Sequence, residues 1–175
     1  MQALARAREL LGFGQFTTIS ISTDEAFAVK TIFKFSDDFD HRLIGSGIKL
    51  TCVAEFRNSR SVQLHQVYEH DEAIYLILDL CPSPDLFSRI EAHGSFYESE
   101  AAALLTELVE SIAECHRRGI AHRDMKPKNV FSDSNGRLLL SDFGSVAFFE
   151  KGARTLKRKV GTPAYMAPEL IAGQN

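Results

Sequence analysis

The chain has 175 residues, of which 45% are hydrophobic and 25% charged, with 5 prolines and 11 glycines. This length suits about one domain, and the composition indicates neither a disordered nor a fibrous chain. The net charge of -3 gives no general attraction to phosphate backbones, so we expect no nucleic acid as the main partner.

The three cysteines, Cys52, Cys81 and Cys115, are odd in number, widely spaced and set among apolar residues. We interpret them as buried thiols of a reducing compartment, and no CxxC pair indicates zinc. The first residues hold no apolar run of signal-peptide length, and no run approaches membrane-spanning length. The expected location is therefore the cytosol, with the nucleus as the other possibility, and no membrane partner is expected.

The first half of the chain has the pattern of short strands. Residues 10–31 predict two or three strands joined by tight turns, the last one centred on the apolar run at 27–32. Residues 36–47 are typical of a loop or of a weak helix start, and 48–56 are compatible with one helix. Two apolar runs, 62–68 and 73–80, predict a hairpin whose second strand is buried on both faces.

The second half changes to a helical pattern. An apolar stripe predicts a helix over residues 99–118, with Ser99 as N-cap and Gly119 as C-cap. A polar loop, a short apolar run at 130–131, a turn at 133–136 and a strand at 138–140 follow. The stripe residues are Ala102, Leu105, Leu108, Val109, Ile112 and Cys115. The sequence thus predicts an α+β fold that is β-rich first and helix-rich second.

The most specific segment is residues 122–129, with the sequence HRDMKPKN. Transfer of a γ-phosphoryl group needs a carboxylate to orient and accept the proton of the attacking hydroxyl, which suits Asp124. Lys126 can reach the charge that develops on the phosphate, and Asn129 offers a neutral oxygen to magnesium. The alternative is a polar turn that caps the preceding helix.

A second segment, SDFG at residues 141–144, follows the predicted strand at 138–140 and resembles the metal-binding turn of protein kinases. Asp142 lies thirteen residues after Asn129, and the resemblance implies that it binds magnesium. Phe143 would pack under the predicted first helix, and Gly144 would permit the sharp change of direction.

These two segments resemble the catalytic loop and the metal-binding turn of protein kinases. The segment GTPAYMAPE at 161–169 is similar to the substrate-platform segment of that family, and Lys126 with Gly161 and Thr162 resembles its Ser/Thr-specific branch. The resemblance implies a protein-kinase-like fold, with a small antiparallel β-rich N-lobe at 1–80 and the hinge and first part of a mainly helical C-lobe at 81–175. It also implies ATP and Mg²⁺ as cofactors and a protein substrate.

The same resemblance implies a set of nucleotide contacts from the glycine-rich loop, the lysine strand, the hinge and the lower lobe. By itself, Lys30 reads equally as an exposed strand lysine. Asp85 reads equally as a solvated carboxylate after a strand end. The implied contacts are Gly12, Gly14, Ile19, Ala28, Lys30, Asp79, Cys81, Asp85 and Phe131.

Residues 80–94 are most similar to plant phosphoenolpyruvate carboxylase kinases, within the calcium/calmodulin-dependent group. Those enzymes are bare kinase domains, and this chain likewise holds no Asp-x-Asp-x-Asp-Gly calcium loop. The resemblance implies a phosphoenolpyruvate carboxylase-like substrate.

Four features depart from the family. No carboxylate stands near residues 47–48, where a glutamate usually pairs with the strand lysine, and Glu55 lies about 10 Å further along the predicted helix. The span from Gly14 to Lys30 is short. Lys128 replaces a usual acidic residue, which disfavours a basic target motif. The chain ends six residues after Glu169, so we expect an incomplete lower lobe with an exposed helix stripe.

Two further hypotheses stay open beside an active kinase: a catalytically inactive chain that binds nucleotide or other proteins, and a truncated product with no role of its own. Phosphate on Thr155 pairing with Arg123 is a hypothesis for regulation, against the alternative that Thr155 is a solvated loop residue.

Overall fold

A computed structural model describes residues 16–20, 26–34, 60–150 and 159–173. The predicted loop at 36–47 and helix at 48–56 lie outside these residues. The chain divides into two compact units. Among the described residues, unit 1 holds 16–20, 26–34 and 62–81, and unit 2 holds 60–61 and 82–173 with the gap at 151–158.

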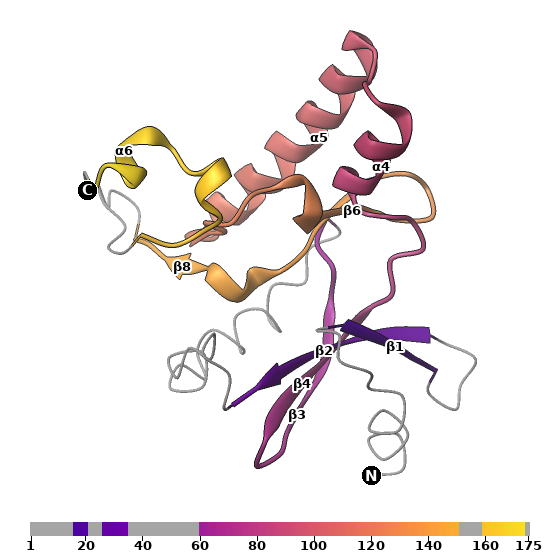
Figure 1. The fold of residues 1–175 in the computed structure, drawn as a ribbon, viewed down its shortest axis with the longest axis vertical. Helices are drawn as coiled ribbons and strands as arrows, with labels where there is room; N and C mark the ends of the chain where they lie inside the picture. Colours follow the sequence, from indigo (N-terminus) through magenta and orange to yellow (C-terminus); the bar gives the residue numbers. More distant parts are fainter. Residues whose placement is uncertain (1–15, 21–25, 35–59, 151–158, 174–175) are drawn as a thin grey trace. The chain divides into compact units, whose positions relative to one another are not determined.

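The described residues of unit 1 form one antiparallel sheet with the strand order β1-β2-β4-β3 (Figure 1). Its strands are β1 (Phe16–Ser20), β2 (Ala26–Phe33), β3 (Leu64–Glu69) and β4 (Ala73–Asp79). The predicted strand at 27–32 and the predicted hairpin are confirmed. Successive side chains of a strand point to opposite faces of the sheet. Ala73, Ile74 and Tyr75 of β4 are all buried, so both faces of β4 are covered, as the sequence predicted.

The described part of unit 2 contains the helix α4 (Leu86–His93), the long helix α5 (Glu98–Arg117) and two small antiparallel pairs of strands. One pair joins β5 (Ile120–Ala121) to β8 (Ala147–Phe148), and the other joins β6 (Val130–Ser132) to β7 (Leu138–Leu140). The remaining elements are the 3₁₀ turns η1 (Pro127–Asn129), η2 (Phe143–Ser145) and η3 (Pro163–Tyr165) and the short α6 (Pro168–Ile171).

The predicted caps of α5 are wrong by one or two residues. Tyr97, not Ser99, is the N-cap, because the Glu100 carboxylate accepts a hydrogen bond of 3.0 Å from the Tyr97 N–H and fixes the start there. Arg118 is the C-cap, and Gly119 follows it in the left-handed conformation at φ 70°. A Cβ at Gly119 would lie 2.6 Å from the Phe149 carbonyl oxygen, so the turn into β5 requires glycine.

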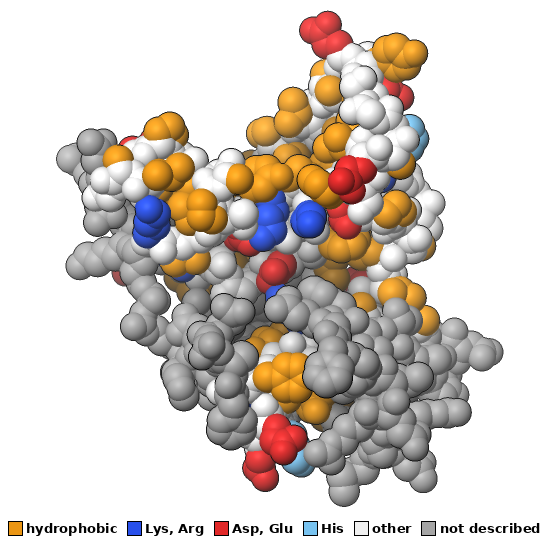
Figure 2. Space-filling view, in the orientation of Figure 1, with side chains coloured by type: hydrophobic (Ala, Val, Ile, Leu, Met, Phe, Trp, Pro, Cys, Tyr) orange, Lys and Arg blue, Asp and Glu red, His pale blue; other side chains and the backbone are white. Residues whose placement is uncertain are grey.

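The apolar stripe of α5 is only partly buried. Cys115 is buried at its C-terminal end, whereas Leu105 and Val109 are 59% and 62% exposed. Figure 2 shows hydrophobic side chains gathered over this helix. The described helices include none that is long and apolar enough to cross a membrane.

Candidate active site

The loop between β5 and β6 carries the segment 122–129. Pro127 begins η1, where its missing N–H costs no hydrogen bond, and the Asn129 N–H donates to the Lys126 carbonyl at 2.9 Å. This tight turn brings Asn129 back toward Asp124, and the Asn129 Nδ2 donates to the Asp124 carbonyl oxygen at 2.8 Å. The sequence therefore folds the loop upon Asp124.

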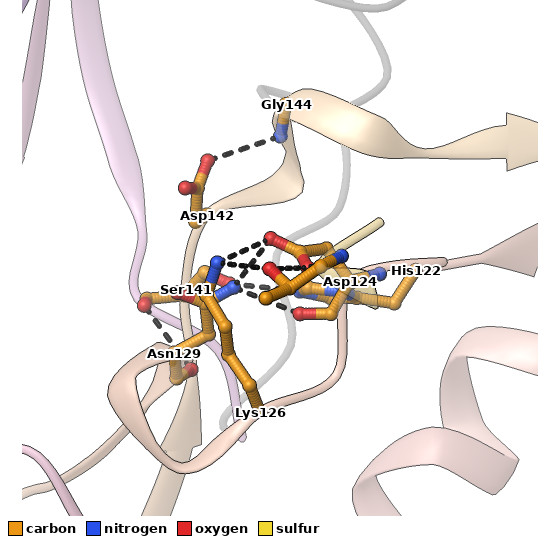
Figure 3. Close-up of polar contacts among 8 residues, drawn as sticks. His122, Asp124, Lys126, Asn129, Ser141, Asp142 and Gly144 are labelled. Carbon is orange, nitrogen blue, oxygen red and sulfur yellow. Dashed lines mark hydrogen bonds and ion pairs between the residues drawn. The ribbon is translucent and has the colours of Figure 1, made fainter. Parts of the chain in front are cut away.

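The Asp124 carboxylate accepts hydrogen bonds on both oxygens (Figure 3). Oδ2 accepts from the Lys126 Nζ at 2.8 Å and lies 3.3 Å from the Asn129 Nδ2. Oδ1 accepts from the Thr162 N–H at 2.9 Å and from the Thr162 Oγ1 at 2.7 Å. The Lys126 Nζ also donates to the Thr162 Oγ1 at 2.8 Å, so three side chains form one connected network.

The charge state of Asp124 follows from this network. Partial burial raises the pKa of the carboxyl, but the hydrogen bonds from Lys126 and Thr162 together outweigh burial and hold the pKa below its ordinary value. Asp124 is therefore ionised at neutral pH, with its two oxygens fixed in direction.

Thr162 is the site residue that sequence reasoning missed, since the Gly161–Thr162 pair was used only to indicate the Ser/Thr branch. Gly161 has φ 124°, and a Cβ there would lie 2.5 Å from the Arg123 carbonyl oxygen. A glycine thus lets the segment before η3 approach the catalytic loop, and it places the next residue, Thr162, against Asp124.

His122 is buried below the loop and links it to the SDFG segment. Its Nε2 donates to the Ser141 carbonyl at 2.8 Å, and its Nδ1 accepts from the Asp124 N–H at 3.3 Å. Both contacts require the neutral ring with the proton on Nε2. Burial lowers the pKa of His122, partly offset by the hydrogen bond to Ser141, and the neutral form agrees with the geometry.

The SDFG segment turns at Asp142, not at Gly144 as the sequence predicted. Asp142 has φ 56° and ψ 65° in the left-handed region, and its Oδ1 accepts from the Gly144 N–H at 3.3 Å. A Cβ on Gly144 would lie 3.1 Å from that oxygen. A side chain at position 144 would therefore crowd the Asp142 carboxylate and shift it by a few tenths of an ångström, while aspartate tolerates the left-handed conformation.

Phe143 is 8% exposed, with its ring centroid 5.0 Å from that of His122. The expected contact with a helix at 48–56 lies outside the described residues. The ring contact adds an apolar link between the SDFG segment and the catalytic loop.

Asn129 and Asp142 are brought together through the backbone. The Ser141 N–H and Oγ both donate to the Asn129 carbonyl, at 2.9 and 3.1 Å. Because Asn129 directs Nδ2 toward Asp124, its amide oxygen is left for another ligand, and no described residue donates to it. An amide oxygen and a carboxylate form the sparse oxygen set that suits Mg²⁺ with phosphate and water ligands, and the described residues contain no denser cluster of metal-binding side chains.

Arg123 has φ 65°, and its side chain binds the backbone that follows the turn at Asp142. Its Nε donates to the Ser145 carbonyl at 2.7 Å and its Nη2 to the Val146 carbonyl at 3.3 Å. Thr155, the hypothesised phosphate site, lies outside the described residues, so pairing of its phosphate with Arg123 stays a prediction.

The candidate nucleotide contacts of unit 1 lie on neighbouring strands. On β2, Ala28 stands opposite Leu78 of β4, and Lys30 stands opposite Leu76. Ile19 of β1 pairs with Phe27. Gly12 and Gly14 lie outside the described residues.

Asp79 ends β4, and its N–H and its carboxylate both make contacts within unit 1. Its N–H donates to the Gln63 carbonyl at 3.0 Å, and its carboxylate accepts from the Gln63 N–H at 2.9 Å and contacts the His65 Nε2 at 2.6 Å. At Cys81, burial, with a smaller effect from Asp79, raises the thiol pKa to about 11. The thiol is therefore protonated at neutral pH.

Two of the candidate nucleotide contacts, Asp85 and Phe131, belong to unit 2. Asp85 is the N-cap of α4 and accepts from the N–H and Oγ of Ser88 at 2.9 and 3.1 Å. This capping role was not predicted, and neither was α4. Phe131 lies on β6 opposite Leu139 and is half-buried.

Comparison with known proteins agrees with this geometry. Residues 6–175 match the family model described as the protein kinase domain. The chain is 34% identical over 170 residues to CBL-interacting serine/threonine-protein kinase 24 of Arabidopsis thaliana, covering 94% of this chain and 38% of that protein. It is 31% identical to calcium/calmodulin-dependent protein kinase type 1 of Caenorhabditis briggsae, over 94% of this chain and 47% of that protein.

The chain belongs to the protein kinase family. Its relatives include serine/threonine-protein kinases and a calcium/calmodulin-dependent kinase, and the α+β kinase fold expected from the sequence is confirmed. The chain spans less than half the length of these relatives.

Proposed function

We propose that this chain transfers the γ-phosphoryl group of ATP to a Ser or Thr hydroxyl of a protein substrate. The network of Asp124, Lys126 and Thr162 is the observation that carries the proposal. It holds a carboxylate ionised and oriented, with an ammonium 2.8 Å away, which is the pair of charges that phosphoryl transfer to a hydroxyl requires.

Asp124 would act chiefly by orienting the acceptor hydroxyl. A carboxylate whose pKa is held below its ordinary value is a weak base, so it takes the proton late, once the hydroxyl has begun to bond to phosphorus. Lys126 would stabilise the charge on the transferred group while keeping Asp124 in place.

When bound, ATP would supply the γ-phosphoryl group and Mg²⁺ would offset its negative charge. Asp142 and Asn129 would hold the metal through a carboxylate and an amide oxygen. Lys30 would bind the α- and β-phosphates, and Asp85 would contact the ribose. The remaining proposed nucleotide contacts are Gly12, Gly14, Ile19, Ala28, Asp79, Cys81 and Phe131.

A finer proposal concerns the protein substrate and rests on the sequence of residues 80–94 alone. On that resemblance, a phosphoenolpyruvate carboxylase-like enzyme is the first substrate to assay. Equal rates of phosphorylation of such a carboxylase and of unrelated proteins would contradict this substrate. The location we propose is the cytosol or nucleus, which imaging of a fluorescent fusion tests.

The activity is tested by incubating the chain with γ-labelled ATP and peptides that differ only in carrying Ser, Thr or Tyr. We expect label on the Ser and Thr peptides, and a chelator of Mg²⁺ should abolish it. Nucleotide binding without transfer to any peptide or protein would instead favour an inactive, nucleotide-binding chain. Failure to bind nucleotide at all would contradict both functions.

A further inference from the structure

Lys128 carries an exposed positive charge in the loop that holds Asp124. It lies in η1, and its Nζ is 4.8 Å from the centroid of the Phe87 ring on α4. Among the described residues, no carboxylate lies within ion-pair distance of this ammonium. A cation over an aromatic face is attracted by the ring and restricted in position, so Phe87 holds the charge in a defined place without neutralising it.

Lys126, two residues earlier, is in the opposite situation. Its ammonium is 2.8 Å from the Asp124 Oδ2 and also donates to Thr162, so its charge is compensated within the site. The loop therefore carries one cation that is tied to the reaction centre and another, Lys128, that faces solvent. A solvent-facing cation with no carboxylate partner attracts anionic groups on a binding partner.

The position of Lys128 limits which groups can reach it. It is four residues after Asp124, so the two Cα atoms lie within about 14 Å of each other. Its neighbour Asn129 contacts the Asp124 carboxylate at 3.3 Å. An extended peptide advances about 3.3 Å per residue, so side chains within roughly four residues of an acceptor hydroxyl at Asp124 fall within reach.

We propose that Lys128, held on the Phe87 ring, is a specificity-determining residue that selects acceptor sites with Asp or Glu within about four residues of the phosphorylated Ser or Thr. The inference rests on the proposed function, because it takes Asp124 as the position of the acceptor hydroxyl. It names the substrate class as acidic protein segments.

The test compares two fluorescent peptides with one central Ser in the same neutral sequence. One carries Glu at the second, third and fourth positions on both sides, and the other carries Lys there. Binding is measured by anisotropy at low and high salt, and kcat/KM is measured with labelled ATP. The proteins are the unaltered chain, Lys128→Glu, Phe87→Leu, and Arg117→Glu as a charge-reversal control at the exposed end of α5, which also loses its ion pair with Glu114.

We expect the unaltered chain to prefer the Glu peptide by about two- to fivefold, the range of an exposed ion pair, with the preference weakened at high salt. Lys128→Glu should reverse the preference, and Phe87→Leu should reduce it without reversal. Arg117→Glu should leave it unchanged, since its charge lies elsewhere.

Several results would overturn the inference: no preference, a preference for the Lys peptide, no binding of either peptide, or a shift with Arg117→Glu as large as with Lys128→Glu. If the binding preference follows Lys128 but neither peptide is labelled, the proposed kinase activity fails, and with it the selection of acceptor sites, while the binding of acidic segments by Lys128 stands.

Discussion

Hydrogen bonds from Thr162 and Lys126 keep the Asp124 carboxylate ionised and fix its direction. The Thr162 hydroxyl donates to the Asp124 Oδ1 and accepts from the Lys126 Nζ, so it uses both of its polar capacities within the site. Hydrogen bonds to charged groups are about twice as strong as neutral ones. One methyl-for-hydroxyl change therefore tests the whole network.

Thr162→Val removes the hydroxyl and leaves the Thr162 backbone N–H bond to Asp124 in place. Loss of a hydrogen bond to a charged group costs about 1.5 to 3 kcal/mol, so turnover should fall roughly ten- to a hundredfold. Steady-state kinetics with a Ser peptide measures the loss. Thr162→Ser should restore most of the rate, and equal rates in all three proteins would show that the network does not position Asp124.

His122 predicts a pH dependence of stability. The pKa of its ring in the folded chain is below the ordinary 6.5. As the pH falls below about 6.5, the ring therefore becomes protonated in the unfolded chain before it does so in the folded chain. The stability contributed by neutral His122 is therefore complete above that pH and is lost as the pH falls toward the folded-state pKa.

This dependence is measured as the thermal midpoint between pH 8 and pH 5 for the unaltered chain and for His122→Gln. Glutamine keeps a donor toward Ser141 but does not titrate. We expect the slope below about pH 6.5 to be smaller in the variant. Identical slopes would mean that other groups cause the pH dependence.

At the scale of elements, local chemistry rather than hydrophobic periodicity sets the ends of the helices. The helix α4 has only eight residues, which is shorter than the window in which apolar periodicity indicates a helix. Its start is fixed by Asp85 and its end by Gly94 at φ 78°. An aspartate three residues before a serine, with a glycine nine residues later, is the signal that was available and unused.

Asp85→Ala should lower the free energy of unfolding by about 1 kcal/mol, the usual effect of losing an N-cap. Asp85→Asn should be nearly neutral, since the amide oxygen also caps. Urea unfolding measures both. If Asp85 also contacts the ribose, Asp85→Asn will weaken nucleotide binding without changing stability; if neither quantity changes in either variant, the cap has no energetic role.

The exposed side of α5 makes a separate prediction. Leu105 and Val109 are more than half exposed, so this helix should bind a hydrophobic dye. Replacing both by Gln should reduce dye fluorescence while changing stability by less than about 0.5 kcal/mol. Leu108→Gln is the control, since this partly buried side chain should lower the melting temperature. Unchanged fluorescence in the double variant would locate dye binding elsewhere.

At the scale of the molecule, the β-rich first half and the helix-rich second half could be predicted because they depend on local sequence, whereas α4 could not. The contact between Thr162 and Asp124 spans 38 residues, and no local pattern indicates it. The left-handed turn at Asp142 was placed at Gly144 because glycine is the usual residue at positive φ. Gly161 is explained both by its φ of 124° and by its close approach to the Arg123 carbonyl oxygen, and the second of these is a tertiary contact that local sequence does not indicate.

In the proposed function, Asp124 serves transfer of the phosphoryl group rather than binding of the nucleotide. Phosphoryl transfer and ATP affinity measured side by side in the unaltered chain and in Asp124→Asn test it most directly. General-base groups contribute about 10² to 10⁴ in rate, so kcat should fall by at least about a hundredfold while the Kd for ATP with Mg²⁺ stays unchanged. An Asp124→Asn chain that transfers phosphate at the unaltered rate would contradict the account.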